Sequence, residues 1–303
     1  KRQQPDGLFY TEPNKQNNFI ETHFMAYVLV GLWHYYLCTH DDHYLASFST
    51  GQGSHGEWTA RTAGTWGNSI GVQICATATA YEQELGASYR VNGAGAVGDT
   101  TVTIDDVDAS GEAFNVGDLI SFYSDSAGST PVDEYNEYEV TAIDTSANTL
   151  TIRLKDDPNG AGLQNIVPDN SYIKRRWRFS DLFDDAPGTS AYATQNARGE
   201  NDELHVAVYD TVGDITGKAV GVNGQRTAAV IELFPNMSKN PNGKTPQGSN
   251  NYYSDVIFAK SQFIYWTDHL SAGSNWGTDI ASGTDYTMVS GVDVSTLTGG
   301  TDD

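Results

Sequence analysis

The sequence predicts an α+β, β-rich protein of more than one domain, and three observations support this fold class. Two strand-like runs, at residues 203–209 and 228–234, flank a glycine-rich turn. A series of short strand candidates separated by turn clusters occupies residues 97–176. Only 18% of the 303 residues are charged, and Gly, Ser, Thr, Asn and Tyr are abundant, which is typical of a globular chain with many turns.

The charge balance and the cysteine content exclude some classes of protein. The formal net charge is −22, so the surface repels phosphate backbones and anionic lipids. The longest apolar run, residues 24–33, is shorter than the roughly 20 residues that span a bilayer. We therefore expect neither nucleic-acid binding nor direct membrane insertion. Two cysteines, Cys38 and Cys75, are too few for a disulfide framework; we expect buried free thiols, with a single bridge as the alternative.

Taken in order, the chain begins with a turn-rich segment and a predicted amphipathic helix at residues 17–29. An aromatic strand is expected at residues 32–38, and a strand with alternating Ile and Val at residues 70–74. The turn before this second strand is expected to bury Trp66.

The two runs named first form the predicted spine of the larger domain. Residues 203–209 alternate between apolar and other side chains, which indicates a half-buried strand. Residues 228–234 are almost all apolar, which fits a strand covered on both faces. The turn between them contains glycines such as Gly213 and Gly217, which adopt positive φ without steric cost. A further strand is expected at residues 261–266.

The short strands of residues 97–176 predict a small β-barrel or sandwich inserted into that larger domain. Residues 1–96 and 177–303 then form one discontinuous domain, in which residues 267–303 are expected as an extended arm toward a missing C-terminal domain. The strand candidates of the insertion are residues 100–104, 118–123, 135–143, 149–154 and 172–178.

Two segments contain residue types that bind metals, but their spacing favours loops. His40-Asp41-Asp42-His43 is compact and has no third ligand at a recognisable offset. The segment from Asp106 to Gly111 begins like an EF-hand loop, yet Gly117 stands where the bidentate Glu is required. We therefore predict no metal site and no cofactor.

Catalytic patterns are equally incomplete. Gly188-Thr189-Ser190 is similar to the short sequence around a subtilase serine, but His205 lies within a strand pattern and no Gly-x-Ser-x-Gly elbow exists. Paired carboxylates such as Asp202-Glu203 are common in a chain with 39 acidic residues, so no pair is singled out. We predict no catalytic residue and no enzymatic activity.

Several segments together resemble the tail sheath proteins of contractile-tailed bacteriophages, most closely those of T4-like myoviruses. In order these are ARTAGTWGNSI from Ala60, APGTS from Ala186, NDELHV from Asn201, and then DITG, ELFPNMS, NYY, SQFIYW and LTGG. Each segment alone is weak, but their ordered occurrence is specific. The family-motif residues are Gly64, Thr65, Trp66, Gly67, Asn68, Gly188, Thr189, Ser190, Asp202, Glu203, Gly217, Tyr252, Tyr253, Ser261, Trp266, Gly299 and Gly300.

The resemblance implies a structural subunit with a mixed α/β sheath-type domain that carries the inserted barrel. Such subunits form stacked rings, expected to be hexameric, in a helical homo-oligomer around a tail tube. The other implied partners are the tail tube protein, the baseplate and the tail terminator proteins. Contraction drives the tube through the host envelope for genome ejection. The implied location is the virion tail, assembled in the host cytoplasm. Residues 28–57 depart from the family pattern, so no function is carried onto them.

Two other functions remain open at this point. A receptor- or carbohydrate-binding virion protein of the baseplate or fibre could use the inserted domain for recognition. A glycosidase or serine hydrolase would require one carboxylate pair, or Ser190, to be essential for turnover.

Overall fold

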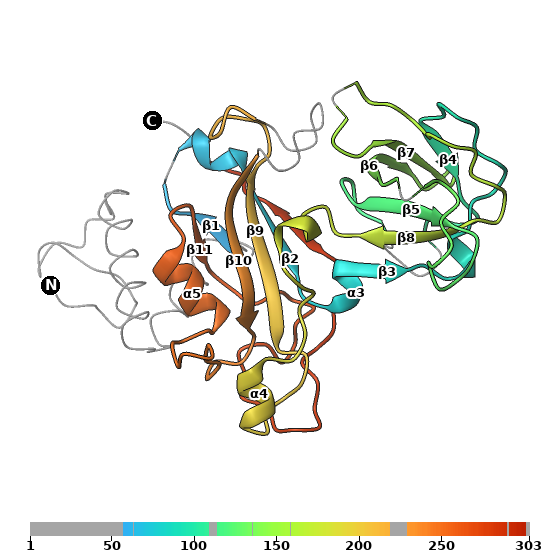
Figure 1. Cartoon of the computed structure of the whole chain (residues 1–303). Coiled ribbons are helices and arrows are strands. Elements are labelled where there is room, and N and C mark those ends of the chain that lie inside the picture. Colours follow the sequence, from blue (N-terminus) through green and yellow to red (C-terminus); the bar gives the residue numbers. More distant parts are fainter. Residues whose placement is uncertain are drawn as a thin grey trace, which may run out of the picture. The chain divides into compact units, whose positions relative to one another are not determined.

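The computed structural model describes residues 57–300, except residues 63, 109–113, 135, 158, 219–228 and 290. These residues form a β-rich fold with three antiparallel sheets and a few short helices (Figure 1). The helix expected at residues 17–29, the strand expected at residues 32–38, Cys38 and the His40–His43 motif lie outside the described residues.

A four-stranded sheet forms the centre of the larger lobe, in the order β10-β9-β2-β12 (Figure 1). Its strands are β2 (Ile70–Cys75), β9 (Glu203–Asp210), β10 (Val230–Ser238) and β12 (Asp293–Thr296). Strand β2 has glycine at position 71 because the Tyr209 ring lies opposite: a Cβ there would be 2.4 Å from Tyr209 Cζ.

The burial of the two spine strands is the reverse of the expectation. Strand β9 is buried along almost its whole length because it pairs with β2 on one side and β10 on the other. Its Leu204, Val206 and Val208 belong to one hydrophobic cluster, while Ala207 and Tyr209 belong to another on the opposite face. Strand β10 lies at the edge of the sheet and is only partly buried, although the run expected as a strand, residues 228–234, is almost all apolar.

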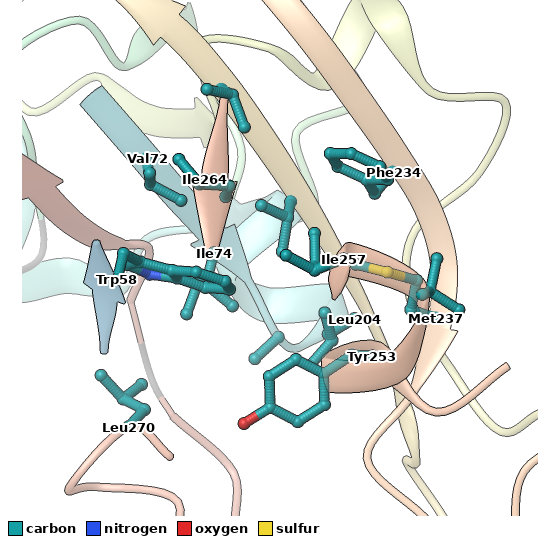
Figure 2. Close-up of a cluster of buried hydrophobic side chains, with 14 of the residues drawn as sticks. Trp58, Val72, Ile74, Leu204, Phe234, Met237, Tyr253, Ile257, Ile264 and Leu270 are labelled. Carbon is teal, nitrogen blue, oxygen red and sulfur yellow. The ribbon is translucent and has the colours of Figure 1, made fainter. Parts of the chain in front are cut away.

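The first of these clusters is the main core of the larger lobe (Figure 2). Short elements cover this face of the sheet: β1 (Trp58–Ala60) pairs with β11 (Ile264–Trp266), and α5 (Tyr253–Lys260) contacts both β10 and β11. Helix α5 buries Tyr253, Val256 and Ile257, which share one helical face. Each such side chain contributes about 1.5–3 kcal/mol when it is fully buried. The packing residues labelled in Figure 2 are Trp58, Val72, Ile74, Leu204, Phe234, Met237, Tyr253, Ile257, Ile264 and Leu270.

A six-stranded antiparallel sheet forms the second lobe, in the order β3-β8-β5-β6-β7-β4. Its own hydrophobic cluster includes Ile120, Phe122, Tyr138, Val140 and Ile152. The strands are β3 (Glu82–Glu84), β4 (Thr101–Thr103), β5 (Leu119–Tyr123), β6 (Tyr138–Asp144), β7 (Thr149–Leu154) and β8 (Tyr172–Arg176).

No closed barrel is found in the part of the chain that the structure describes, because β3 and β4 are at opposite edges and do not pair with each other. The sheet also includes β3, which lies before the boundary expected at residue 97. We call this six-stranded sheet with its connecting loops, residues 82–176, the insertion lobe.

The segment expected as an extended arm, from residue 267 onward, returns to the four-stranded sheet. Trp276 and Tyr286 are buried in the main core, and β12 adds an edge strand beside β2. The apolar positions of this segment are far apart and separated by Gly, Ser and Thr, so no strand period precedes β12 in the sequence.

Candidate functional site

Asp202 joins three of the family-like segments. It is fully buried immediately before β9, and its carboxylate accepts hydrogen bonds from Ser190 N (2.7 Å), Ser190 Oγ (2.9 Å) and Ser238 Oγ (2.5 Å). Its carbonyl oxygen accepts one from Lys239 N at 2.7 Å. A buried carboxylate requires such donors because it has lost its water. Asp202 therefore fixes the APGTS, NDELHV and ELFPNMS segments in one arrangement.

The neighbouring motif residues extend this network. Gly188 and Glu203 exchange two contacts: Glu203 N donates to Gly188 O at 2.9 Å, and Gly188 N donates to Glu203 Oε2 at 3.1 Å. Thr189 Oγ1 accepts from Asn201 N at 2.8 Å. Ser190 also caps α4 (Ala191–Gln195), since its Oγ accepts from Ala193 N at 3.1 Å.

A second junction joins the GTWGN and LTGG segments. Asn68 Nδ2 donates to Gly300 O at 2.9 Å, and Gly300 N donates to Asn68 Oδ1 at 2.8 Å. Gly300 must be glycine here, because a Cβ would lie 2.1 Å from Gly64 O. Gly64 has φ 115° and precedes the 3₁₀ helix η1 (Thr65–Ser69), which contains the exposed Thr65 and the buried Gly67. Gly299 is exposed, with φ 83°.

Aromatic side chains of η1, α5 and the segment that follows α5 contact one another. Trp66 stacks on Phe263 with ring centroids 5.6 Å apart. Tyr253 is buried, and its hydroxyl accepts from Trp266 Nε1 at 3.1 Å and lies 2.6 Å from His269 Nδ1. Tyr252 Oη lies 3.4 Å from His269 Nε2. Burial lowers the pKa of His269, which favours the neutral ring.

Ser261 and Arg61 hold the end of α5. Ser261 Oγ donates to Glu232 Oε2 at 2.7 Å, which ties the helix end to β10. Arg61 Nε donates to Ile264 O at 3.0 Å, and its guanidinium also donates to Phe258 O near the C-terminal end of the helix. The guanidinium lies 4.1 Å from the centre of the Tyr265 ring. Arg61 was not among the predicted site residues, although it is part of the ARTAGTWGN segment.

The glycine-rich turn after β9 is organised by Asp210. This buried carboxylate accepts hydrogen bonds from Ser69 Oγ and from the amides of Gly213, Ile215 and Thr216, at 2.6–2.9 Å. Gly217, at the end of the turn, has φ 75° and donates to Gly213 O. The glycines thus allow the backbone to bend around a carboxylate of this chain.

A pocket of about 320 Å³ lies beside the Asp202 network. Most of the residues that line it are of polar type; the lining residues are Ser190, Ala191, Glu203, Pro235, Asn236, Lys244, Thr245, Pro246, Gln247 and Asn251. Burial raises the pKa of Glu203. The Ser190 hydroxyl is already used by Asp202 and Ala193, so it lacks the Ser–His hydrogen bond of a catalytic triad.

His205 makes structural contacts with backbone groups and aromatic rings. Nδ1 accepts from Asn236 N at 3.0 Å, so Nε2 carries the proton that it donates to Asp185 O at 2.8 Å. Its ring stacks on Phe183 with centroids 4.4 Å apart. Burial lowers its pKa, and the hydrogen bond that Nδ1 accepts further favours the neutral form.

Lys239 is a fully buried cation held by carbonyl groups. Nζ donates to Ala76 O at 2.8 Å and to Asn201 O at 2.7 Å, and it lies 5.2 Å from the centre of the Trp276 ring. Burial lowers the pKa of Lys239 to about 8, although Asp202 opposes this effect. Cys75 is a buried free thiol whose pKa is raised by burial.

Neither a metal cluster nor a membrane span is found within the described ranges. No group of three or more His, Cys, Asp and Glu side chains there could hold a metal ion. The segment that begins like an EF-hand loop is described only in part. In that part, the Asp106 carboxylate accepts a hydrogen bond from Asp108 N. None of the helices in these ranges is long and apolar enough to cross a bilayer.

No family model matches this sequence, and no curated protein matches it significantly. The selection of the family-motif residues therefore depends on the order of the motifs in the sequence, and their contacts describe what each residue does in the fold. Within the described residues, those contacts gather most of the motifs around Asp202, Asn68 and Tyr253, and they use the polar groups for internal hydrogen bonds.

Proposed function

We propose that this chain is a structural subunit of a contractile phage tail sheath. It polymerises helically around a tail tube, and contraction drives the tube through the host cell envelope. The observation that carries the proposal is the ordered occurrence of the family-like segments from Ala60 to Gly300. The sheath-type domain corresponds to the larger lobe, and the insertion lobe is the addition that it carries.

The contacts of the motif residues support this function. Asn68 and Gly300 are 232 positions apart yet form a two-way hydrogen bond. Asp202 binds hydroxyl groups from two segments in a fully buried setting. A sheath subunit must move as a rigid body when its interfaces rearrange, and networks of this kind resist deformation.

The acidic composition is also consistent with a sheath. Heterologous contacts between copies generate open helical arrays. With a net charge of −22, copies repel one another at low ionic strength, and salt screens that repulsion. We therefore expect the rate and extent of polymerisation to depend on salt.

Electron microscopy of the purified full-length gene product tests the proposal. We expect helical cylinders, either hollow or filled with tube protein, whose formation changes with ionic strength. The wild type is compared with the variant Gly300→Val. The new side chain collides with Gly64 O and breaks the junction with Asn68. A wild-type protein that stays monomeric at all concentrations and salt levels, with or without tube protein, would contradict the proposal.

A receptor-binding virion protein is the second candidate. The observation in its favour is that Val97 and Ile166, on loops of the insertion lobe, are 62% and 63% exposed. Binding of host-surface glycans by the whole chain, without any cylinders, would favour this function over a sheath.

A further inference from the structure

A narrow neck connects the two lobes. The chain crosses between them twice, at Tyr81–Glu82 and at Arg176–Trp177. The two crossings are adjacent, because Trp177 N donates to Tyr81 O at 2.8 Å and β3 pairs with β8. Each lobe has its own hydrophobic cluster. A two-stranded connection between separately packed bodies has the form of a hinge.

Asp181 belongs to the larger lobe. It lies in the 3₁₀ helix η3 (Ser180–Leu182), between Phe179 and Phe183. Both phenylalanines pack in the cluster that includes Ala207 and Tyr209 of β9. The Tyr81 hydroxyl further fixes this turn by donating to Ser180 O at 2.8 Å.

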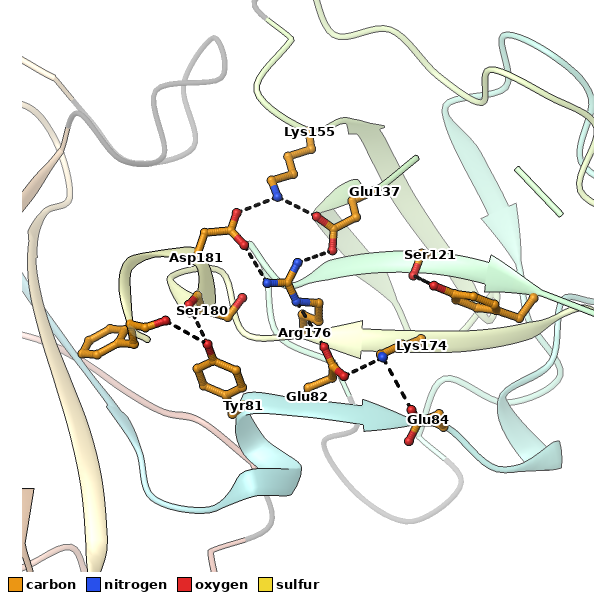
Figure 3. Close-up of polar contacts among 12 residues, drawn as sticks. Tyr81, Glu82, Glu84, Ser121, Glu137, Lys155, Lys174, Arg176, Ser180 and Asp181 are labelled. Atoms are coloured by element: carbon orange, nitrogen blue, oxygen red, sulfur yellow. Dashed lines mark hydrogen bonds and ion pairs between the residues drawn. The ribbon is translucent and has the colours of Figure 1, made fainter. Parts of the chain in front are cut away.

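Two cations of the insertion lobe reach Asp181 (Figure 3). Lys155 Nζ lies 2.6 Å from Asp181 Oδ2, and Arg176 Nη2 lies 2.6 Å from Asp181 Oδ1. Glu137 bridges the same two cations, at 2.5 Å from Lys155 and 2.6 Å from Arg176. These four side chains are between 18% and 30% exposed, so dissolved salt has access to them. We call the contacts of Asp181 with Lys155 and Arg176 the latch.

A second ionic contact crosses between the lobes in a buried position. Arg178 follows the neck, and its Nη2 lies 3.1 Å from Glu139 Oε1 of β6. Glu139 Oε2 accepts from Arg153 at 2.6 Å, so the carboxylate is shared by two guanidinium groups. The Arg178 guanidinium also passes over Gly117, where a Cβ would lie 1.9 Å from Nη2.

We propose that the latch holds the insertion lobe in one orientation, and that its release lets this lobe swing on the neck about the buried Arg178–Glu139 contact. The physical basis is the difference in exposure of the two contacts. Ion pairs open to solvent are weak and are screened by salt, whereas a buried pair is screened far less and is costly to break. The device is independent of the sheath proposal, because every contact lies within one chain.

Two variants separate the latch from ordinary surface ion pairs. Asp181→Asn removes the carboxylate charge of the latch and leaves the Arg178–Glu139 contact in place. Lys174→Met is the matched control: it removes ion pairs of Lys174 with Glu82 and Glu84, which lie within the insertion lobe. The lobe-to-lobe distance is measured by pulsed dipolar spectroscopy between labels on ketone side chains introduced at Val97 and Val212. Both positions are more than 60% exposed, and the native cysteines stay in place.

We expect a broader distance distribution for Asp181→Asn than for the wild type, and an unchanged distribution for Lys174→Met. Exchange of the Trp177 amide should be about two- to tenfold faster in Asp181→Asn, while amides of β9 keep their protection. Raising salt from ~0.01 M to ~1 M shortens the Debye length from about 30 Å to about 3 Å, so the wild type should broaden in the same way.

The salt titration uses unaltered side chains at the latch, so it tests the proposal even if a variant folds poorly. Equal distributions for the wild type at both salt levels would overturn the proposal. So would equal broadening by Asp181→Asn and Lys174→Met.

Discussion

Replacing Asp210 by Asn should destabilise the larger lobe, because the carboxylate organises the turn after β9. Its two oxygens accept five hydrogen bonds, from Ser69 Oγ, Gly213 N, Ile215 N, Thr216 N and Thr216 Oγ1. An Asn side chain of the same shape has one acceptor oxygen, and its NH₂ group faces donors. The groups that donate to one of the two carboxylate oxygens in the wild type are therefore left without an acceptor.

The magnitude follows from the pKa of the carboxyl group. Burial raises the pKa of Asp210, but the hydrogen bonds from Ser69 and from the turn amides outweigh burial and lower it from 3.8 to about 2. Because the folded state holds the proton less tightly than the unfolded state, the charge stabilises the fold above pH 4. This stabilisation is about 2 kcal/mol at neutral pH and disappears as the pH falls through about 2.

Urea unfolding followed by tryptophan fluorescence measures this loss. We expect Asp210→Asn to lower the free energy of unfolding by about 2 kcal/mol at pH 7, and the difference from the wild type to shrink between pH 4 and pH 2. The control is Asp144→Asn, which removes a carboxylate that accepts similar turn hydrogen bonds but is exposed, so its effect should be smaller. A pH-independent difference, or no difference at all, would refute the reasoning.

Three further predictions use the same measurement. Asn68→Ala removes both hydrogen bonds to Gly300 and should cost about 1–3 kcal/mol, with faster exchange of the Gly300 amide. His205 has a lowered pKa, so the unfolded state binds its proton more readily; stability should fall below about pH 6.5, and His205→Gln should lack this slope. Lys239 has a pKa of about 8, so wild-type stability should rise between about pH 8 and 10, and Lys239→Met should lack that rise.

The sequence predicts several strands well because their patterns are local. The strand expected at residues 149–154 is confirmed by β7, and those expected at 70–74 and 203–209 correspond to β2 and β9 within one residue. The predicted burial of the two spine strands, β9 and β10, was wrong, because an apolar run does not indicate which strand lies at the edge of a sheet. Strand β12 and helix α5 were not predicted, because each is stabilised by tertiary contacts rather than by a strong period.

The candidate site shows the same difference between local sequence patterns, which could be predicted, and tertiary contacts, which could not. Motif order in the sequence selected Asp202, Asn68 and Ser190, and the structure shows what each one contacts. No local pattern predicts that Asn68 contacts Gly300 or that Arg61 supports the end of α5. The ionic contacts of Asp181 were not predicted for the same reason: they depend on the pairing of β5 with both β6 and β8, on the pairing of β6 with β7, and on the turn that follows β8.

The edge strand β12 has a consequence for how the protein is made. The four-stranded sheet cannot be completed until Asp293–Thr296 has left the ribosome, because β12 pairs with a strand that begins at Ile70. Neighbouring hairpins such as β6–β7 close over short loops, so the insertion lobe can fold while the rest of the chain is being synthesised. Until then the backbone N–H and C=O groups on that edge of β2 have no strand to pair with, and an open edge of this kind can pair with a strand of another chain.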